Sequence, residues 1–100
     1  MAVMVTLEWA GMTAAQYDEI REGVGWLNEA PAGGRVHVAA IDENGGHMTD
    51  VWDSAEEFQT FVDTRLMPVV EKVGLDGAPD VRVYPLHELY VPQAETVLAT

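Results

Sequence analysis

The clearest alternation of hydrophobic and polar positions lies in residues 33–52. Two apolar runs, over 33–41 and 47–52, have the length and the Val-rich composition of strands. Asn44 and Gly45 lie between the runs. This pair favours a two-residue type I′ turn because both residues tolerate a positive φ angle. The pattern therefore predicts an antiparallel β-hairpin.

The predicted turn also determines which residues of the hairpin face each other. It pairs Glu43 with Gly46, Ile41 with Met48, Ala39 with Asp50 and His37 with Trp52. Since paired residues share a face of a sheet, His37, Asp50 and Trp52 are expected on one face, with His47 on the other. A longer turn through Gly46 would slip the pairing by one residue and change the partners.

A strand and a helix are predicted before the hairpin. Residues 2–9 are rich in Val, Met and Leu and have the pattern of a buried strand. Thr13 and Gln16 have the spacing of a capping box, so a helix is expected to begin here. Its apolar stripe consists of Tyr17, Ile20, Val24 and Leu27.

A second helix and a last strand are predicted after the hairpin. Ser54 and Glu57 again have the spacing of a capping box. The helical stripe then runs through Phe58, Phe61, Val62, Leu66, Val69, Val70 and Val73. Pro68 predicts either a kink or a break in which it opens a short further helix. Residues 80–89 predict a strand, and Pro85 indicates an edge position or a bulge.

The order of elements, β-α-β-β-α-β, predicts a ferredoxin-like α+β fold with a four-stranded antiparallel sheet. We expect a single domain over residues 1–90 and a C-terminal arm over 91–100. Both faces of the hairpin carry apolar residues, while two helices cover only one face of a sheet. A second copy of the chain is the simplest cover for the other face, so a homodimer is expected.

The charge of the chain excludes two classes of partner. Its 100 residues include 17 acidic and 5 basic residues, which gives a formal net charge of −12. Nucleic acids and anionic membrane surfaces both require basic patches, so neither is expected to bind. No signal peptide and no membrane-spanning segment is recognised. Together with the absence of cysteine, this favours a cytoplasmic location.

The segment Asp50-Val51-Trp52-Asp53-Ser54-Ala55-Glu56-Glu57-Phe58, followed by Phe61, resembles the dimeric α+β barrel superfamily. Within it, residues 2–90 are similar to the antibiotic-biosynthesis-monooxygenase-type domains. The resemblance implies that two chains pack their sheets face to face and that each keeps a pocket between its sheet and its helices. Some members oxidise polycyclic phenols with dioxygen and no cofactor; others degrade haem, isomerise lactones or have no known activity. Trp52 matches a strand tryptophan described near the substrate.

The best candidate site is the cluster around His37. A neighbouring carboxylate, here Asp50, fixes the tautomer of an imidazole and suits it to act as a general base. Trp52 would form a wall for a flat substrate, and Arg35 would hold a substrate carbonyl or carboxylate. Further candidates for the pocket lining are the aromatic residues Tyr17, Trp26 and Phe58, together with Trp9 and Phe61. The alternative is that His37 is a core histidine and Asp50 its structural partner.

No cofactor and no metal ion is expected. His37, His47 and His87 are predicted to lie on different strands, and no metal-binding spacing is present. Two functions follow. The first is a cofactor-independent monooxygenase-like enzyme acting on a small aromatic or polyketide-like compound. The alternative is a non-catalytic dimeric α+β barrel protein that at most binds an apolar small molecule.

Overall fold

The computed structural model describes residues 1–93 and has the predicted order of elements. The strands are β1 (Val3–Ala10), β2 (Gly34–Asp42), β3 (Gly45–Trp52) and β4 (Asp80–Pro85). The helices are α1 (Ala14–Val24), α2 (Ala55–Phe61), the π-helix η1 (Val62–Leu66) and α3 (Met67–Val73). The four strands form an antiparallel sheet in the order β2-β3-β1-β4. The predicted ferredoxin-like α+β fold is therefore confirmed.

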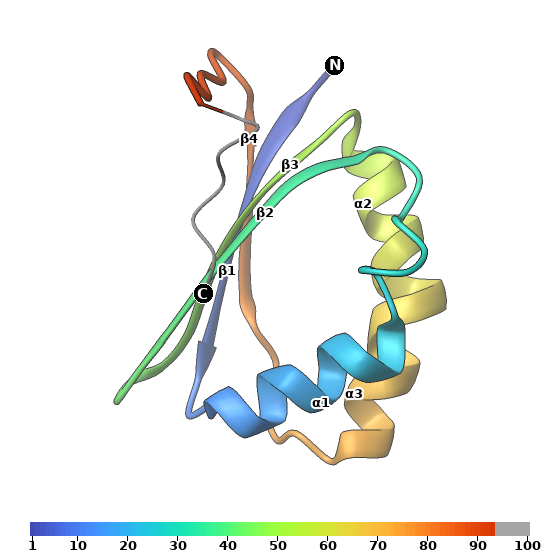
Figure 1. Cartoon of the computed structure of the whole chain (residues 1–100), viewed down its shortest axis with the longest axis vertical. Coiled ribbons are helices and arrows are strands. Elements are labelled where there is room, and N and C mark those ends of the chain that lie inside the picture. The colour runs from blue at the N-terminus through green and yellow to red at the C-terminus, as the bar shows by residue number, and fades with distance from the viewer. Residues whose placement is uncertain (94–100) are drawn as a thin grey trace.

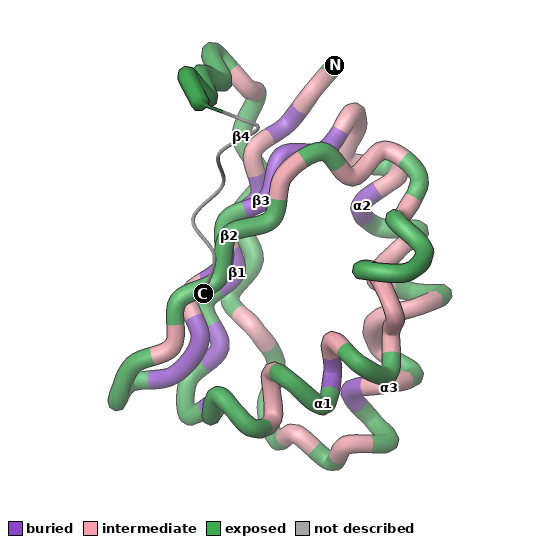
Figure 2. Tube along the Cα trace, viewed as in Figure 1, coloured by how far each residue is buried: buried purple, intermediate pink, exposed green. Residues whose placement is uncertain are grey.

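The helices of residues 1–93 all lie on one side of the sheet (Figure 1). Alternate residues of β1 point to this side and are buried: Val3, Val5, Leu7 and Trp9. Buried positions accordingly follow β1 and β3 in Figure 2. The opposite face of the sheet carries apolar side chains without helices over them, including Val38, 58% exposed, and Tyr84, 42% exposed. No helix within residues 1–93 is long and apolar enough to cross a membrane.

The predicted pairing within the hairpin is wrong by two residues. His37 lies opposite Asp50, Ala39 opposite Met48 and Ile41 opposite Gly46. The turn consists of Glu43 and Asn44, because Asp42 pairs with Gly45. A slip of two residues exchanges partners and keeps faces, since side chains alternate with a period of two. His37, Asp50 and Trp52 therefore share the helix-covered face as predicted, and His47 lies on the other face.

Local chemistry at the hairpin end explains why the turn excludes Gly45. The carboxylate of Asp42 accepts a hydrogen bond of 2.9 Å from the backbone N–H of Asn44, which closes the turn one residue early. Gly45 has a φ angle of 133°, and a Cβ atom there would lie 2.2 Å from the carbonyl oxygen of Trp9. Gly45 is therefore required for the contact between β3 and β1, where it pairs with Ala10.

The first helix has the predicted N-terminal cap, but its apolar stripe is shorter than predicted. The side chain of Thr13 accepts from the backbone N–H of Gln16 at 3.1 Å, and the Gln16 side chain accepts from Thr13 in return. Gly25 ends α1 with a φ angle of 74°. Leu27 was expected on the helical stripe, but it lies beyond this cap and is exposed.

The segment after β3 contains a π-helix that the sequence pattern did not predict. Ser54 caps α2 through the backbone N–H of Glu57, at 3.1 Å. In η1 the N–H of Met67 donates to the carbonyl of Val62, five residues earlier. Pro68 then occupies the first turn of α3, which follows η1 directly, so Pro68 lies at the start of a short helix as in the second alternative, but without the predicted break. A π-turn before Pro68 suits a residue that has no N–H to donate.

The last strand is shorter than predicted. β4 ends at Pro85 rather than at residue 89, because proline cannot continue the ladder of hydrogen bonds. A single bond of 3.0 Å follows, from the N–H of Leu86 to the carbonyl of Ala2. His87 therefore lies outside the strand. The predicted arm over residues 91–100 lies for the most part outside the described residues.

Candidate functional site

A cavity of about 180 Å³ lies between the helix-covered face of the sheet and the helices. Its walls are mainly apolar. Six aromatic residues line it, namely Trp9, Tyr17, Trp26, Trp52, Phe58 and Phe61. They come from β1, α1, the segment after α1, β3 and α2. The fold thus gathers residues that are distant in the sequence into one aromatic pocket.

His37 and Asp50 form the polar part of this lining. They lie directly opposite each other on β2 and β3, and the Nδ1 atom of His37 is 2.6 Å from Oδ1 of Asp50. The side chain of Asp50 is only 9% exposed, whereas that of His37 is 34% exposed. A buried carboxylate that reaches a more accessible imidazole is the arrangement that a general base requires.

Two further hydrogen bonds extend this pair into a chain of four side chains. The indole Nε1–H of Trp52 donates to Oδ2 of Asp50 at 3.1 Å. The hydroxyl of Tyr17 lies 2.8 Å from Nε2 of His37. Because a carboxylate only accepts, Nδ1 of His37 carries a proton, and in the neutral imidazole Nε2 is then the acceptor. Tyr17 then donates to His37, and His37 donates to Asp50.

Burial acts on the hydroxyl at the end of this chain. Desolvation raises the pKa of Tyr17, and the nearby Asp50 acts in the same direction, while the charge of Arg21 acts against them. The Tyr17 hydroxyl therefore keeps its proton near neutral pH and remains a hydrogen-bond donor.

Aromatic rings surround the imidazole and the indole. The ring centroid of Trp26 lies 5.2 Å from that of His37 and 6.0 Å from that of Tyr17. On the other side, Trp52 packs against Phe61 at 5.3 Å and against Phe58 at 5.6 Å. These tilted and edge-on arrangements are favourable between aromatic rings. They leave the hydrogen-bonded chain at the margin of an apolar pocket.

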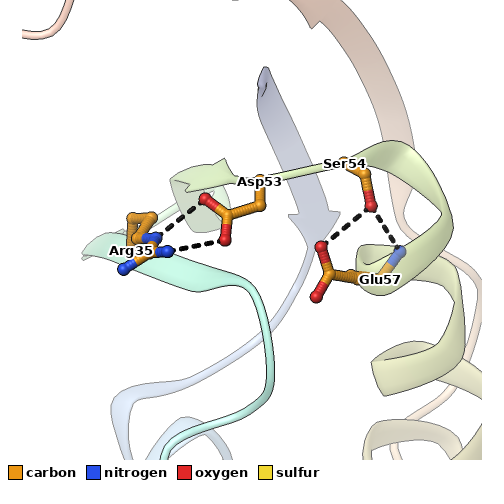
Figure 3. A network of polar contacts seen from close by, with 4 residues as sticks. All are labelled: Arg35, Asp53, Ser54 and Glu57. Atoms are coloured by element: carbon orange, nitrogen blue, oxygen red, sulfur yellow. Dashed lines mark hydrogen bonds and ion pairs between the residues drawn. The ribbon is translucent and has the colours of Figure 1, made fainter. Parts of the chain in front are cut away.

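Arg35 lines the same cavity, but it belongs to a different set of contacts. A bulge between Gly34 and Val36 takes Arg35 out of the regular alternation of β2, so it does not simply share a face with His37 as predicted. Its guanidinium forms two bonds with Asp53, at 2.8 and 2.7 Å (Figure 3). These bonds raise the pKa of Arg35 and lower that of Asp53. Arg35 thus pairs with a neighbouring acid.

Several solved structures, including the following three, resemble this arrangement of elements. One is provisionally named an antibiotic biosynthesis monooxygenase, from Chloroflexus aurantiacus, with a TM-score of 0.63 and 16% identity over 90% of this chain and 98% of that one. SnoaB, a cofactor-independent oxygenase from Streptomyces nogalater, has a TM-score of 0.60 and 9% identity over 88% of this chain and 94% of that one. The ActVA-Orf6 monooxygenase of Streptomyces coelicolor, solved with nanaomycin D, has a TM-score of 0.56 and 19% identity over 91% of each chain.

The chain shares the fold of these three structures. At these identities the likeness is one of fold, which can host many functions. No family model matches the sequence, and no curated protein matches it either.

Within this fold, the structure brings the predicted site residues together. His37, Asp50 and Trp52 are linked by hydrogen bonds. Tyr17, Trp26, Phe58 and Arg35 line the same cavity. The bond between Tyr17 and His37 was not predicted. Its only signal in the sequence was the place of Tyr17 on the apolar stripe of a helix that had to pack over the sheet.

Sequence reasoning also missed Arg65, which fixes the segment that carries Trp26. The Nη2 atom of Arg65 donates to the carbonyls of Val24 at 3.1 Å and of Glu29 at 2.8 Å. Its guanidinium also lies 5.7 Å from the ring centroid of Phe61. Arg65 belongs to η1, so the π-turn aims a cation at the C-terminal end of α1. This contact positions one wall of the cavity.

His47 has carboxylate partners on the opposite face of the sheet. Its Nδ1 atom is 2.5 Å from Glu8, and its Nε2 atom is 2.8 Å from Asp42. The bonds to Asp42 and Glu8 raise the pKa of His47, and the bond from His47 lowers the pKa of Asp42. Among residues 1–93, no group of three or more His, Asp or Glu residues could hold a metal ion.

Proposed function

We propose that this chain is a cofactor-independent monooxygenase-like enzyme that acts on a small aromatic or polyketide-like phenol. The observation that carries the proposal is the hydrogen bond between His37 and the buried Asp50 at the edge of an aromatic cavity. His37 is the base and Asp50 orients it, while Trp52, Trp26, Tyr17 and Phe58 enclose the substrate. Arg35 stands beside the cavity, where it interacts with a polar substituent.

The proposed reaction needs no reductant other than the substrate. His37 receives the phenol proton, and the phenolate becomes electron-rich enough to react with dioxygen. A ring carbon para to the hydroxyl loses its hydrogen and bonds to one oxygen atom, and the other oxygen atom leaves as water. The ring becomes a quinone, so the substrate itself supplies the four electrons that reduce dioxygen. A base and a dry aromatic pocket are the protein's contributions.

The size of the cavity suggests the size of the substrate. Its volume is about 180 Å³. An apolar protein cavity of about 150 Å³ accommodates benzene. We therefore favour a phenol of one or two fused rings, which lies in the cavity against the aromatic wall that includes Trp26 and Phe61 and has its hydroxyl toward His37.

We also propose that the chain is a homodimer, with the helix-free face of the sheet as its interface. This face includes the exposed side chains of Val38 and Tyr84, and exposed apolar patches on a sheet commonly mark an interface. Light scattering in dilute solution is expected to give twice the chain mass of 10.9 kDa. A monomer at micromolar concentration would contradict this assembly.

The chain lacks cysteine, and we expect it to act in the reducing cytoplasm.

One observation favours the alternative of a non-catalytic protein that binds an apolar molecule. Both ring nitrogens of His37 already have protein partners, Asp50 and Tyr17. A histidine with a purely structural role is satisfied in the same way. In that case the cavity would bind 1-naphthol without changing it.

Oxygen consumption with 1-naphthol tests the two functions. The enzyme hypothesis predicts one dioxygen consumed for each 1,4-naphthoquinone and water formed. His37→Gln should reduce the rate by about 100-fold, as expected on loss of a general base. His87→Gln, which changes a histidine outside the cavity, is the matched control. Binding of 1-naphthol without oxygen uptake by the wild-type protein would support the alternative instead.

A further inference from the structure

We propose that Tyr17 is a catalytic residue, whose hydroxyl passes the proton of the phenol substrate to Nε2 of His37. This assignment rests on the proposed function and adds a residue to its chemistry. His37 would then act as the base through Tyr17, without direct contact with the substrate oxygen.

The hydrogen bonds of His37 leave the imidazole without a free acceptor. Nδ1 lies 2.6 Å from Asp50, and Nε2 lies 2.8 Å from the hydroxyl of Tyr17. A phenol in the cavity can therefore reach His37 in two ways. It can displace the Tyr17 hydroxyl, or it can use that hydroxyl as a bridge.

The position of Tyr17 favours the bridge. Its ring is parallel to the imidazole of His37 within 4°, and its hydroxyl lies 2.8 Å from Nε2, within hydrogen-bond distance. Trp26 packs edge-on against the Tyr17 ring, with centroids 6.0 Å apart. Displacement would break the hydrogen bond and move a half-buried side chain of a well-capped helix. The bridge needs no movement, because a hydroxyl oxygen can accept one hydrogen bond while it donates another.

The proton balance of the step is simple. The substrate O–H bond breaks and its proton moves to Oη of Tyr17. The original proton of Tyr17 moves to Nε2 of His37. Tyr17 ends as a neutral hydroxyl that donates to the phenolate, and His37 ends as an imidazolium that faces the carboxylate of Asp50. Burial raises the pKa of Tyr17, so the hydroxyl starts the step with the proton that it must pass on.

The spectrum of bound 4-nitrophenol provides the test, because its ionised and neutral forms absorb at different wavelengths. The full-length wild-type protein is compared with Tyr17→Phe and His37→Gln at one pH. The bridge predicts that both variants bind the ligand but lower the ratio of ionised to neutral bound ligand by about tenfold or more. In Tyr17→Phe the ring still covers Nε2 and cannot relay a proton. Tyr90→Phe, at an exposed tyrosine, is the control and should retain the wild-type ratio.

The outcomes separate this inference from the proposed function. If His37→Gln lowers the ratio but Tyr17→Phe stays within about twofold of the wild type, Tyr17 is displaced and the bridge is wrong. If the wild type and His37→Gln ionise the ligand equally, the base assignment itself fails.

A second measurement avoids the risk that Tyr17→Phe does not fold. Fluorinated tyrosine is incorporated into a protein carrying Tyr84→Phe and Tyr90→Phe, so that only Tyr17 is labelled. A more acidic hydroxyl donates more strongly to a phenolate that it touches. The bridge predicts that fluorination raises the ratio of ionised to neutral bound 4-nitrophenol severalfold. An unchanged ratio would overturn it.

Discussion

The indole of Trp52 donates a hydrogen bond of 3.1 Å to Oδ2 of Asp50, which lies two residues earlier on the same strand. Residues two apart on a strand share a face, so the two side chains lie side by side under the helices. Trp52 satisfies one carboxylate oxygen, and the other is left for His37. The tryptophan is therefore part of the polar chain as well as of the aromatic wall.

Trp52→Phe should destabilise the fold because it leaves Oδ2 of the buried Asp50 without its donor. An unsatisfied buried acceptor costs about 1–3 kcal/mol, so we expect a loss of about 2 kcal/mol beyond the packing effect. Urea unfolding measures it. Trp26→Phe is the control, since it also removes an indole from the cavity wall. Equal losses in the two variants would show that the hydrogen bond contributes nothing.

Asp50→Asn should reduce turnover more than it reduces stability. The amide keeps the shape of the carboxylate but cannot stabilise the imidazolium of His37 by charge, so the rate should fall by about 100-fold. Oxygen uptake with 1-naphthol and thermal unfolding are measured on the same samples. Asp53→Asn, which affects the pair with Arg35 outside the polar chain, should lose much less activity. A fully active Asp50→Asn variant would remove Asp50 from the mechanism.

Gly45→Ala tests the local cause of the hairpin register. Its Cβ atom would meet the carbonyl of Trp9, and its φ angle of 133° is strained for any other residue. We expect a loss of more than about 3 kcal/mol in the free energy of unfolding. Gly77→Ala has a positive φ angle but no atom within 4 Å of the new Cβ, so it should cost only about 1 kcal/mol. Similar losses of unfolding free energy in the two variants would contradict the predicted clash.

Arg65→Met should loosen the segment that carries Trp26. It removes the bonds to the carbonyls of Val24 and Glu29 and keeps much of the aliphatic stem, with an expected cost of about 2 kcal/mol. Hydrogen exchange should become faster in residues 25–33. Lys72→Met also removes one positive charge, on an exposed position of α3, and serves as the control. Unchanged exchange in residues 25–33 would contradict the anchoring role.

His47 should make stability depend on pH. Its pKa is raised in the folded state by the bonds to Asp42 and Glu8, so protonated His47 favours folding. The contribution is fully present below the ordinary value of about 6.5 and is lost as pH rises through the folded pKa. The wild type should therefore exceed His47→Gln in unfolding free energy by more at pH of about 6 than at about 9. A difference that grows with pH would contradict the assignment, and His87→Gln controls for charge.

The sequence was sufficient for the face of the sheet on which the site lies, and insufficient for the pairing. Alternation alone places His37, Asp50 and Trp52 on one face, because successive side chains of a strand point to opposite faces whatever their partners are. The partners depend on the turn, which a side-chain bond from Asp42 and the contact of Gly45 with β1 decide. The contact of Gly45 joins two segments that are distant in the sequence, so local turn preferences do not reveal it.

The polar chain could be predicted only in part for a similar reason. The shared face of His37 and Asp50 follows from two strands joined by a short turn, but their direct pairing does not. The Tyr17 hydroxyl reaches His37 only when α1 packs over β2, and Arg65 reaches Glu29 only through the π-turn. Both contacts depend on how the helices lie on the sheet. An apolar stripe shows which face of a helix packs on the sheet, but not where along a strand the helix lies.

A crystal structure with 1-naphthol bound is the most direct test of whether this pocket is the place where a phenol loses its proton. We predict that the two rings lie in the cavity lined by Trp26 and Phe61 and that the naphthol oxygen is within hydrogen-bond distance of Oη of Tyr17, which remains bonded to His37. Naphthol bound on the helix-free face of the sheet, or in the cavity with its hydroxyl turned away from Tyr17 and His37, would contradict the proposed site.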